Sequence, residues 1–508
     1  MSDSRTKNTV KSTLTNILEQ LFLLVYGLFI PRLIIQTYGS EVNGLTAFIQ
    51  QFLNVFQLLQ AGTVGASIYQ LYKPIATNNY EQINIIVDAS KKFFFKVGNV
   101  FMALVLLLIP LICYLQKDSS FTKMELIITT IIMGINGLLT FCFDARYDIV
   151  ISSYQKRYIM SFARLINKII YCILVICVVY FKKYYIYLYL SSLIAKIFAI
   201  FIMRHNYKKI SFCWEKKLKV NNYKIPNRLY IFSTQIAFQI ISVAPLLFVS
   251  LFHNLSEISV YSINFVIASL IQMIITAFVQ SVTEPLANYK QLNSEKNTKL
   301  LYDVIVKGVF LCVTLFSTCL CCLETSFMNI YMGGIKEVQY VRPIFSISLT
   351  LYVFSFSTYL LLNLLVDIQG LFKEIYRYPI IALIFTIPLL FLFAYFFDVE
   401  YVIFGYSLFY FIITFFYLYN ISKKSQLLNK KKFFLYLCIS ILVISFVRII
   451  FSPFVGRNFK IFEWILFAFV VFLTTMIIEF IILLIVDKNF ILLIKSKIIN
   501  MFKEKINE

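Results

Sequence analysis

The sequence has little charge and very little histidine. Only 14% of its 508 residues are charged and two are histidine, whereas a soluble domain is about 25% charged. The low charge therefore argues against a soluble globular domain. Both histidines, His205 and His253, lie at the edges of loops. A histidine proton relay inside an apolar segment is therefore not expected.

Motifs of the common catalytic sites are also absent. The sequence has no G-x-x-x-x-G-K-[ST] phosphate loop, which excludes an ATPase cassette, and no H-E-x-x-H or G-x-S-x-G. No cluster has the spacing of metal ligands. Most of the ten cysteines lie in apolar runs, where Cys319, Cys321 and Cys322 are expected to pack as small apolar side chains. The sequence therefore predicts neither an enzyme nor a bound cofactor or metal.

Long apolar runs are abundant instead. Hydrophobic residues make up 60% of the chain, and a helix that crosses a bilayer needs about 20 of them in succession. Only helices satisfy their backbone within one such segment. The runs predict an all-α polytopic membrane protein with about 14 transmembrane helices. The predicted spans are 14–36, 42–72, 97–116, 126–143, 159–181, 184–203, 229–256, 258–283, 300–323, 343–366, 378–397, 401–422, 433–452 and 461–486.

The charge that is present is mostly positive. Lysine and arginine number 47 against 25 acidic residues, a formal net charge of +22. Basic loops of membrane proteins lie on the cytoplasmic side, and the basic segments 204–228 and 423–432 then place both termini in the cytoplasm. We expect a multi-pass protein of the bacterial plasma (inner) membrane. Because membrane orientation accounts for the positive charge, no nucleic-acid partner is expected.

Two stretches of the chain are similar to each other. Residues 38–50 read YGSEVNGLTAFIQ and residues 254–266 read NLSEISVYSINFV. Their offset of about 216 residues, with the same orientation, is typical of a parallel internal repeat. We expect these domains: a six-helix bundle over 1–203, a basic cytoplasmic linker over 204–228, a second six-helix bundle over 229–422, and peripheral helices 13–14 with a cytoplasmic tail over 423–508.

Amide side chains gather on one face of several predicted spans. At about 100° per residue, Gln50, Asn54 and Gln57 fall within about 60° of one another on a helix. An amide without a partner in hydrocarbon costs several kcal/mol, so this face must meet partner side chains or water. Interhelical hydrogen bonds would explain a single stripe. Similar stripes on corresponding spans of both halves favour a water-filled cleft between the halves.

Charged residues inside spans are functional candidates. Lys196 lies mid-span and must face a cleft or form a pair. Arg32 can reach the interface instead, and the segment DARYD (144–148) can form a local ion network. Glu19 and Glu284 are candidates to couple transport to a proton or sodium gradient. The residues predicted to line the substrate cleft are Glu19, Arg32, Gln50, Asn54, Gln57, Arg146, Lys196, Gln235, Gln239, Gln272, Gln280 and Glu284.

Several stretches together resemble a known family. Pro31-Arg32-Leu33, TYGSEVNGL (37–45) and QLLQAGTVGASIYQLYKPIATNNYEQINIIVDASKKFF (57–94) resemble the oligosaccharide flippases. These form the Wzx-like, polysaccharide-transport branch of the multidrug/oligosaccharidyl-lipid/polysaccharide (MOP) exporter superfamily. The resemblance implies that a polyprenyl-pyrophosphate-linked oligosaccharide is flipped to the outer leaflet for capsule, exopolysaccharide or O-antigen assembly. It also implies membrane lipids, a polysaccharide polymerase and glycosyltransferases as partners.

Two other functions share parts of this pattern. An ion-coupled multidrug exporter of the same fold would favour an acidic, aromatic cleft, and the deep lysine and arginine residues argue against it. An integral-membrane polysaccharide polymerase usually needs a sizeable outside loop with catalytic arginine or histidine. The longest predicted outside loop, 327–342, is short and contains no histidine.

Overall fold

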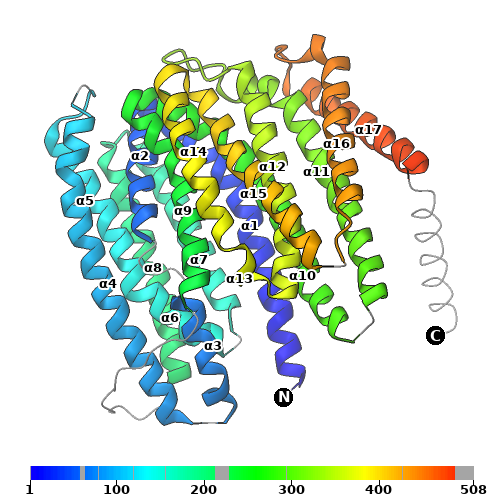
Figure 1. The fold of residues 1–508 in the computed structure, drawn as a ribbon. Helices are drawn as coiled ribbons and strands as arrows, with labels where there is room; N and C mark the ends of the chain where they lie inside the picture. The colour runs from blue at the N-terminus through cyan, green and yellow to red at the C-terminus, as the bar shows by residue number, and fades with distance from the viewer. Residues whose placement is uncertain are drawn as a thin grey trace. The chain divides into compact units, whose positions relative to one another are not determined.

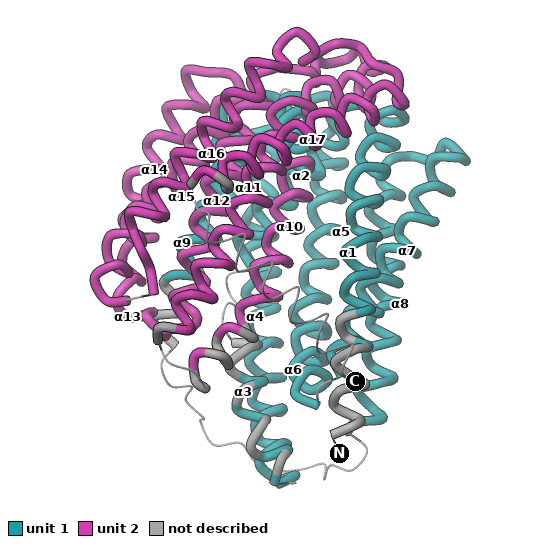
Figure 2. Tube along the Cα trace, turned by 90° about the vertical axis from the view of Figure 1, so that its right-hand side faces the viewer, with its two compact units in different colours: residues 1–266 teal, residues 267–508 magenta. Residues whose placement is uncertain are grey.

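The chain folds as a set of long helices. The computed structural model describes residues 2–57, 63–77, 79–117, 119–154, 156–211, 228–292, 295–425 and 427–486. Every regular element within these ranges is a helix, which confirms the all-α fold class. Contacts divide the chain into unit 1, Met1–Val266, and unit 2, Ile267–Glu508, which are coloured separately in Figure 2. This boundary falls within a helix that runs from Leu255 to Leu292, so the four predicted domains stay a prediction from the repeat.

Unit 1 brings together helices that are distant in sequence (Figure 1). Helix α1 packs against α7, α7 against α8, and α2 against α9. Helix α1 also contacts α2, so α1, α2 and α9, three of the spans predicted to carry amide or charged side chains, lie beside one another. The helices are α1 (Ser2–Tyr38), α2 (Ser40–Phe56), α3 (Thr63–Ala76), α4 (Tyr80–Leu115), α5 (Lys123–Leu139), the π-helix η2 (Thr140–Asp144), α6 (Ala145–Ser153), α7 (Tyr158–Tyr180), α8 (Ile186–Ser211), α9 (Arg228–Phe252) and the start of α10 (Leu255–Leu292).

Unit 2 is arranged around two central helices. Helix α12 packs along α15 and α11, and α11 also contacts α16 and α17. Besides the rest of α10, the elements of the unit are α11 (Glu295–Met332), α12 (Pro343–Gln369), α13 (Phe372–Ile375), α14 (Arg377–Phe396), α15 (Val399–Lys424), α16 (Lys430–Ile450), the 3-10 helix η3 (Ser452–Phe454) and α17 (Ile461–Val486).

Twelve helices in the described residues are long and apolar enough to cross a membrane. The other two predicted spans correspond to α2, with 17 residues, and to α9, whose apolar part is Ile236–Phe252. The predicted span over 42–72 is wrong in extent, because the run is divided between α2 and α3. A run without charge does not reveal where a helix ends.

Local sequence explains several helix ends. Thr122 begins α5 with a capping box: its hydroxyl accepts from the Glu125 backbone N–H at 3.3 Å, and the Glu125 carboxylate accepts from the Thr122 N–H at 2.6 Å. Asn79 and Asn429 cap α4 and α16, because the side chain of each accepts a hydrogen bond from the backbone N–H three residues later. Gly370 ends α12 in the left-handed region, with φ 69°. These signals set where α4, α5 and α16 begin and where α12 ends.

The two similar stretches of the sequence meet in the structure. The Asn43 side chain of α2 donates a hydrogen bond of 2.9 Å to the hydroxyl of Ser259 in α10, 216 residues later. This separation equals the offset of the internal repeat, and equivalent residues beside a twofold pseudo-axis contact each other in this way. The contact therefore supports a parallel repeat.

Gly44 allows this close approach of α2 and α10. A Cβ atom at Gly44 would lie 1.9 Å from the backbone oxygen of Leu255, and a backbone oxygen cannot rotate away as a side chain can. Gly44→Ala is expected to lower the free energy of unfolding by about 2 kcal/mol or more, because the helices must separate. Thermal unfolding of the protein in lipid or detergent measures this loss.

Gly308→Ala provides the matched control. No atom lies within 4 Å of the position that its Cβ would take, and alanine has the higher helix propensity. We expect this variant to be as stable as the parent or slightly more stable. Equal melting of the two alanine variants would contradict the close contact at Gly44.

Candidate functional site

A network of charged side chains lies among the membrane-spanning helices of unit 1. We call this set the interior ion network. It comprises Glu19 of α1, Asp144 of η2, Asp148 of α6, Arg164 and Lys168 of α7, and Lys196 of α8. Sequence reasoning proposed Glu19 and Lys196 for the substrate cleft and missed Arg164 and Lys168. The signal that was available for these two is their position, one helical turn apart inside an otherwise apolar run.

Arg164 holds α7 to α1 through Glu19. Its Nε lies 2.7 Å from one carboxylate oxygen of Glu19 and its Nη2 lies 3.0 Å from the other, a bidentate geometry that is among the stronger ion pairs. Glu19 is 7% exposed. Arg164 also donates to the hydroxyl of Ser161 at 3.0 Å, and Ser161 donates to Asn16. The four residues occupy i and i+3 positions of two facing helices, which aligns them.

Lys196 of α8 pairs with Asp144 of η2. Lys196 is 7% exposed, and its ammonium donates to Oδ2 of Asp144. Asp144 is the last residue of the π-helix η2, a local widening of the helix that often occurs at functional sites. Its second oxygen, Oδ1, is buried without a hydrogen-bond partner. Of the two expectations for Lys196, a cleft or a pair, the structure shows the pair.

Lys168 differs from the other two cations of the network. It is half-buried, and its ammonium lies 4.8 Å from the centre of the Tyr26 ring. The charges of Lys196 and Glu19 both act on it. No carboxylate in the described part of the chain lies within ion-pairing distance of it. Lys168 therefore remains available to an anionic ligand.

The segment DARYD does not form the local ion network that was the alternative expectation. Asp148 accepts from Ser152 at 2.5 Å. The guanidinium of Arg146 lies over the rings of Tyr207 and Tyr147, at 5.3 and 5.8 Å. The Nε of Arg146 is buried with no hydrogen-bond partner. Within the described residues, Arg146 forms no ion pair with Asp144 or Asp148.

The amide stripe of α2 is present and meets α9. Gln50 and Gln57 both donate to the side-chain oxygen of Asn54, at 2.9 and 3.5 Å. Gln239 of α9 donates to the backbone oxygen of Asn54 at 3.1 Å. Gln50 and Gln57 are exposed, so their amide groups remain accessible to water or to a ligand. Four of the predicted polar residues are thus adjacent.

The remaining predicted residues are not part of these contacts, or their side chains lie outside the described part of the structure. In unit 2, Gln272 accepts from the hydroxyl of Tyr352 at 2.9 Å, and Gln280 is exposed. Arg32 is half-buried near one end of α1. The side chains of Gln235 and Glu284 lie outside the described part of the structure. The proposal of a cleft between the halves therefore stays a prediction.

Comparison with known proteins identifies the fold. No protein-family model and no curated protein matches the sequence. The structure is similar to that of lipid II flippase MurJ in an inward closed conformation, with a TM-score of 0.66 and 17% identity over 93% of this chain and 100% of that chain. It is similar to an inward-facing multidrug resistance MATE family transporter of the MOP superfamily, with a TM-score of 0.65 and 9% identity over 82% and 98% of the two chains.

A third similar structure is a MOP-superfamily transporter from Pyrococcus furiosus, with a TM-score of 0.58 and 11% identity over 83% of this chain and 96% of that chain. At such low identities the likeness concerns the fold alone. The structural match nevertheless extends over 96% or more of each of these three transporter chains. The membrane helices are therefore arranged in the same way. This chain is thus a multi-pass membrane protein with the fold of the MOP-superfamily transporters.

Proposed function

We propose that this protein flips a polyprenyl-pyrophosphate-linked oligosaccharide from the cytoplasmic to the outer leaflet by alternating access. The unit would serve assembly of a surface polysaccharide. Two features support the proposal: the fold is similar to that of a lipid II flippase, and residues 30–95 resemble the oligosaccharide flippases. The chemistry of unit 1 adds an independent argument.

The observation that carries the proposal is Lys168. A cation inside a membrane span is costly and is usually paired, yet within the described residues Lys168 contacts the Tyr26 ring, at 4.8 Å, and no carboxylate. A pyrophosphate would supply the missing negative charge, and ammonium-to-phosphate hydrogen bonds are stronger than neutral ones. The neighbouring cations Arg164 and Lys196 would add to the attraction even while they hold their own carboxylates.

The amide group on α2 and α9 suits the glycan part of such a substrate. An amide presents a donor and an acceptor together, which matches sugar hydroxyls. Gln50 and Gln57 are exposed while both contact Asn54, so their remaining donors and acceptors can exchange water for a sugar.

Export of organic cations is the second candidate function. It is favoured by Asp144, whose buried Oδ1 has no hydrogen-bond partner, because an organic cation could satisfy that oxygen. A multidrug transporter of the MATE family also shares the fold. The two functions differ in the sign of the group that binds substrate, and this difference can be tested.

Lys168→Met tests the proposal directly. We expect the rate of flipping of a labelled polyprenyl-pyrophosphate oligosaccharide in proteoliposomes to fall about tenfold or more, which is the effect of losing one hydrogen bond to a charged group. Lys168→Arg, which keeps the charge, should retain most of the rate. Both variants should melt like the parent, because no ion pair within the described residues is lost.

The same proteoliposomes separate the two functions. If Lys168→Met flips the glycolipid at the parental rate, the proposed role of this cation is wrong. If Asp144→Asn, in addition, abolishes the efflux of a lipophilic cation, the protein is a cation exporter. The glycolipid proposal requires the opposite pattern, with flipping dependent on Lys168 and no cation efflux.

A further inference from the structure

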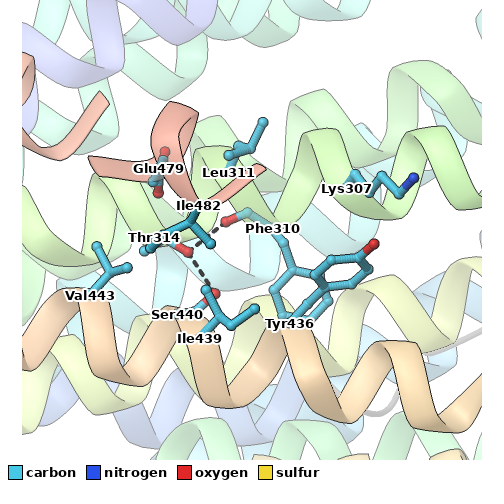
Figure 3. A pocket seen from close by; sticks show the side chains of 10 residues that line it. All are labelled: Lys307, Phe310, Leu311, Thr314, Tyr436, Ile439, Ser440, Val443, Glu479 and Ile482. Carbon is cyan, nitrogen blue, oxygen red and sulfur yellow. Dashed lines mark hydrogen bonds between the residues drawn. The ribbon is translucent and has the colours of Figure 1, made fainter. Parts of the chain in front are cut away.

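A second group of polar side chains lies in unit 2. It surrounds a cavity of about 40 Å³ between α11, α16 and α17 (Figure 3). A cavity of this size has room for about two or three water molecules. Most of its lining is apolar, but Glu479 of α17, Thr314 of α11 and Ser440 of α16 also line it. Each of the three helices thus contributes at least one polar group.

Glu479 is the unusual member of this group. Its side chain is 6% exposed, and its Oε1 is buried without a hydrogen-bond partner. No basic side chain of the described residues lies within ion-pairing distance of it. A lone ionised carboxylate in an apolar environment is strongly unfavourable, so a carboxyl group there is stable only as the neutral acid.

The charged and titratable groups that face Glu479 do not replace such a partner. Helix α11 contributes Lys307 to the same cavity and the thiols of Cys312 and Cys319 nearby; α16 contributes Tyr436. Lys307 is seven residues from Thr314, about 10 Å along the helix, and Figure 3 shows it on the opposite side of the cavity from Glu479. The thiols and the phenol are neutral groups at ordinary pH.

The hydroxyl groups of Thr314 and Ser440 line the cavity, and each can change its hydrogen-bond partners. Thr314 and Ser440 lie 2.7 Å apart, oxygen to oxygen, and Thr314 also donates to the backbone oxygen of Phe310 at 2.7 Å. A hydroxyl can rotate to donate or to accept. A water molecule in the cavity would therefore find three polar partners, namely Glu479, Thr314 and Ser440, as ordered buried water requires.

We propose that Glu479 is a proton-binding site of the α11–α16–α17 group, neutral while the cavity is dry and able to release its proton to water that enters beside Thr314 and Ser440. A metal cation is a poorer occupant. Among the described residues, the side-chain oxygens that line the cavity come from these three residues and Tyr436, fewer than the six or so that a hard cation takes. This site does not depend on which substrate is proposed for unit 1.

Carbodiimide labelling tests the proposal, because hydrophobic carbodiimides react with protonated carboxyl groups inside membranes. The full-length protein in lipid vesicles is treated with dicyclohexylcarbodiimide across a pH series, and the adducts are mapped by mass spectrometry. We expect an adduct on Glu479 that decreases as the pH rises and that is unchanged when sodium chloride replaces choline chloride. Glu479→Gln should lose it. Glu463→Gln, which removes an exposed carboxylate of the same helix, should keep it.

An infrared measurement makes the test independent of reagent access. The spectrum of the parent minus that of Glu479→Gln should contain the C=O band of a neutral carboxylic acid, and this band should disappear at high pH. Absence of the band at every pH would overturn the proposal. Protection of Glu479 from the carbodiimide by sodium ions would also overturn it, in favour of a sodium site.

Discussion

Lys196→Met is expected to abolish transport and to lower the free energy of unfolding by about 3–5 kcal/mol. The substitution leaves Asp144, whose side chain is 18% exposed, without its ion-pair partner, while Oδ1 of the same carboxylate already lacks a hydrogen bond within the described residues. It also removes a cation that acts on Lys168. Chemical or thermal unfolding in lipid and flipping in proteoliposomes measure the two effects. Lys209→Met, at the exposed end of α8, should change neither.

A double variant separates stability from transport. Asp144→Asn together with Lys196→Met removes both charges, and replacing a buried pair by neutral groups often costs little. We expect the double variant to recover most of the stability and to remain inactive, because the cation is still missing. Recovery of transport together with stability would show that the pair is only structural, contrary to the proposed role of Lys196.

Arg164→Ala should give the second large effect, a loss of about 1–3 kcal/mol in the free energy of unfolding, since the buried carboxylate of Glu19 would lose both hydrogen bonds of its bidentate partner. The hydrogen bond to Ser161 would be lost as well. Hydrogen exchange should show the loss as faster opening of α1 and α7, the two helices that this residue joins. Arg164→Lys keeps the charge but cannot form both hydrogen bonds with the planar carboxylate. Its free energy of unfolding should therefore lie between that of the parent and that of Arg164→Ala.

Two further variants make the Arg164 result specific. Arg157→Ala removes an exposed cation next to the first residue of α7, and such surface changes usually alter stability by less than about 0.5 kcal/mol. Glu19→Gln combined with Arg164→Ala should recover part of the loss, because no buried charge then remains alone. If Arg164→Ala and Arg157→Ala were equally stable, the pair between α1 and α7 would be no more than a surface contact.

Much of the fold could be predicted because crossing a membrane is a local requirement. Each span has to satisfy its own backbone and present apolar side chains to lipid, so length and composition suffice to locate it. The same reasoning placed Lys196 mid-span, where it must have a partner. It also detected the amide face of Gln50, Asn54 and Gln57, whose spacing along one helix is a property of that helix alone.

The parts that could not be predicted depend on contacts between helices. Nothing near Glu19 indicates that its partner is Arg164, 145 residues later, because that pairing depends on how α1 and α7 are rotated against each other. The missed division of 42–72 and the π-helix that ends at Asp144 have the same origin. Small adjustments of helix register respond to neighbouring helices rather than to the hydropathy of the run.

By itself, then, the sequence determined an all-helical membrane protein, the order of its spans, and which helices carry polar faces, since each of these follows from side chains a few residues apart. Only the tertiary structure decided which charges are paired, that Lys168 has no carboxylate partner within the described residues, and that Glu479 faces a cavity without a hydrogen bond to Oε1. The reason is physical: hydrophobicity acts along one segment, whereas the cost of a buried charge depends on what the other segments place beside it.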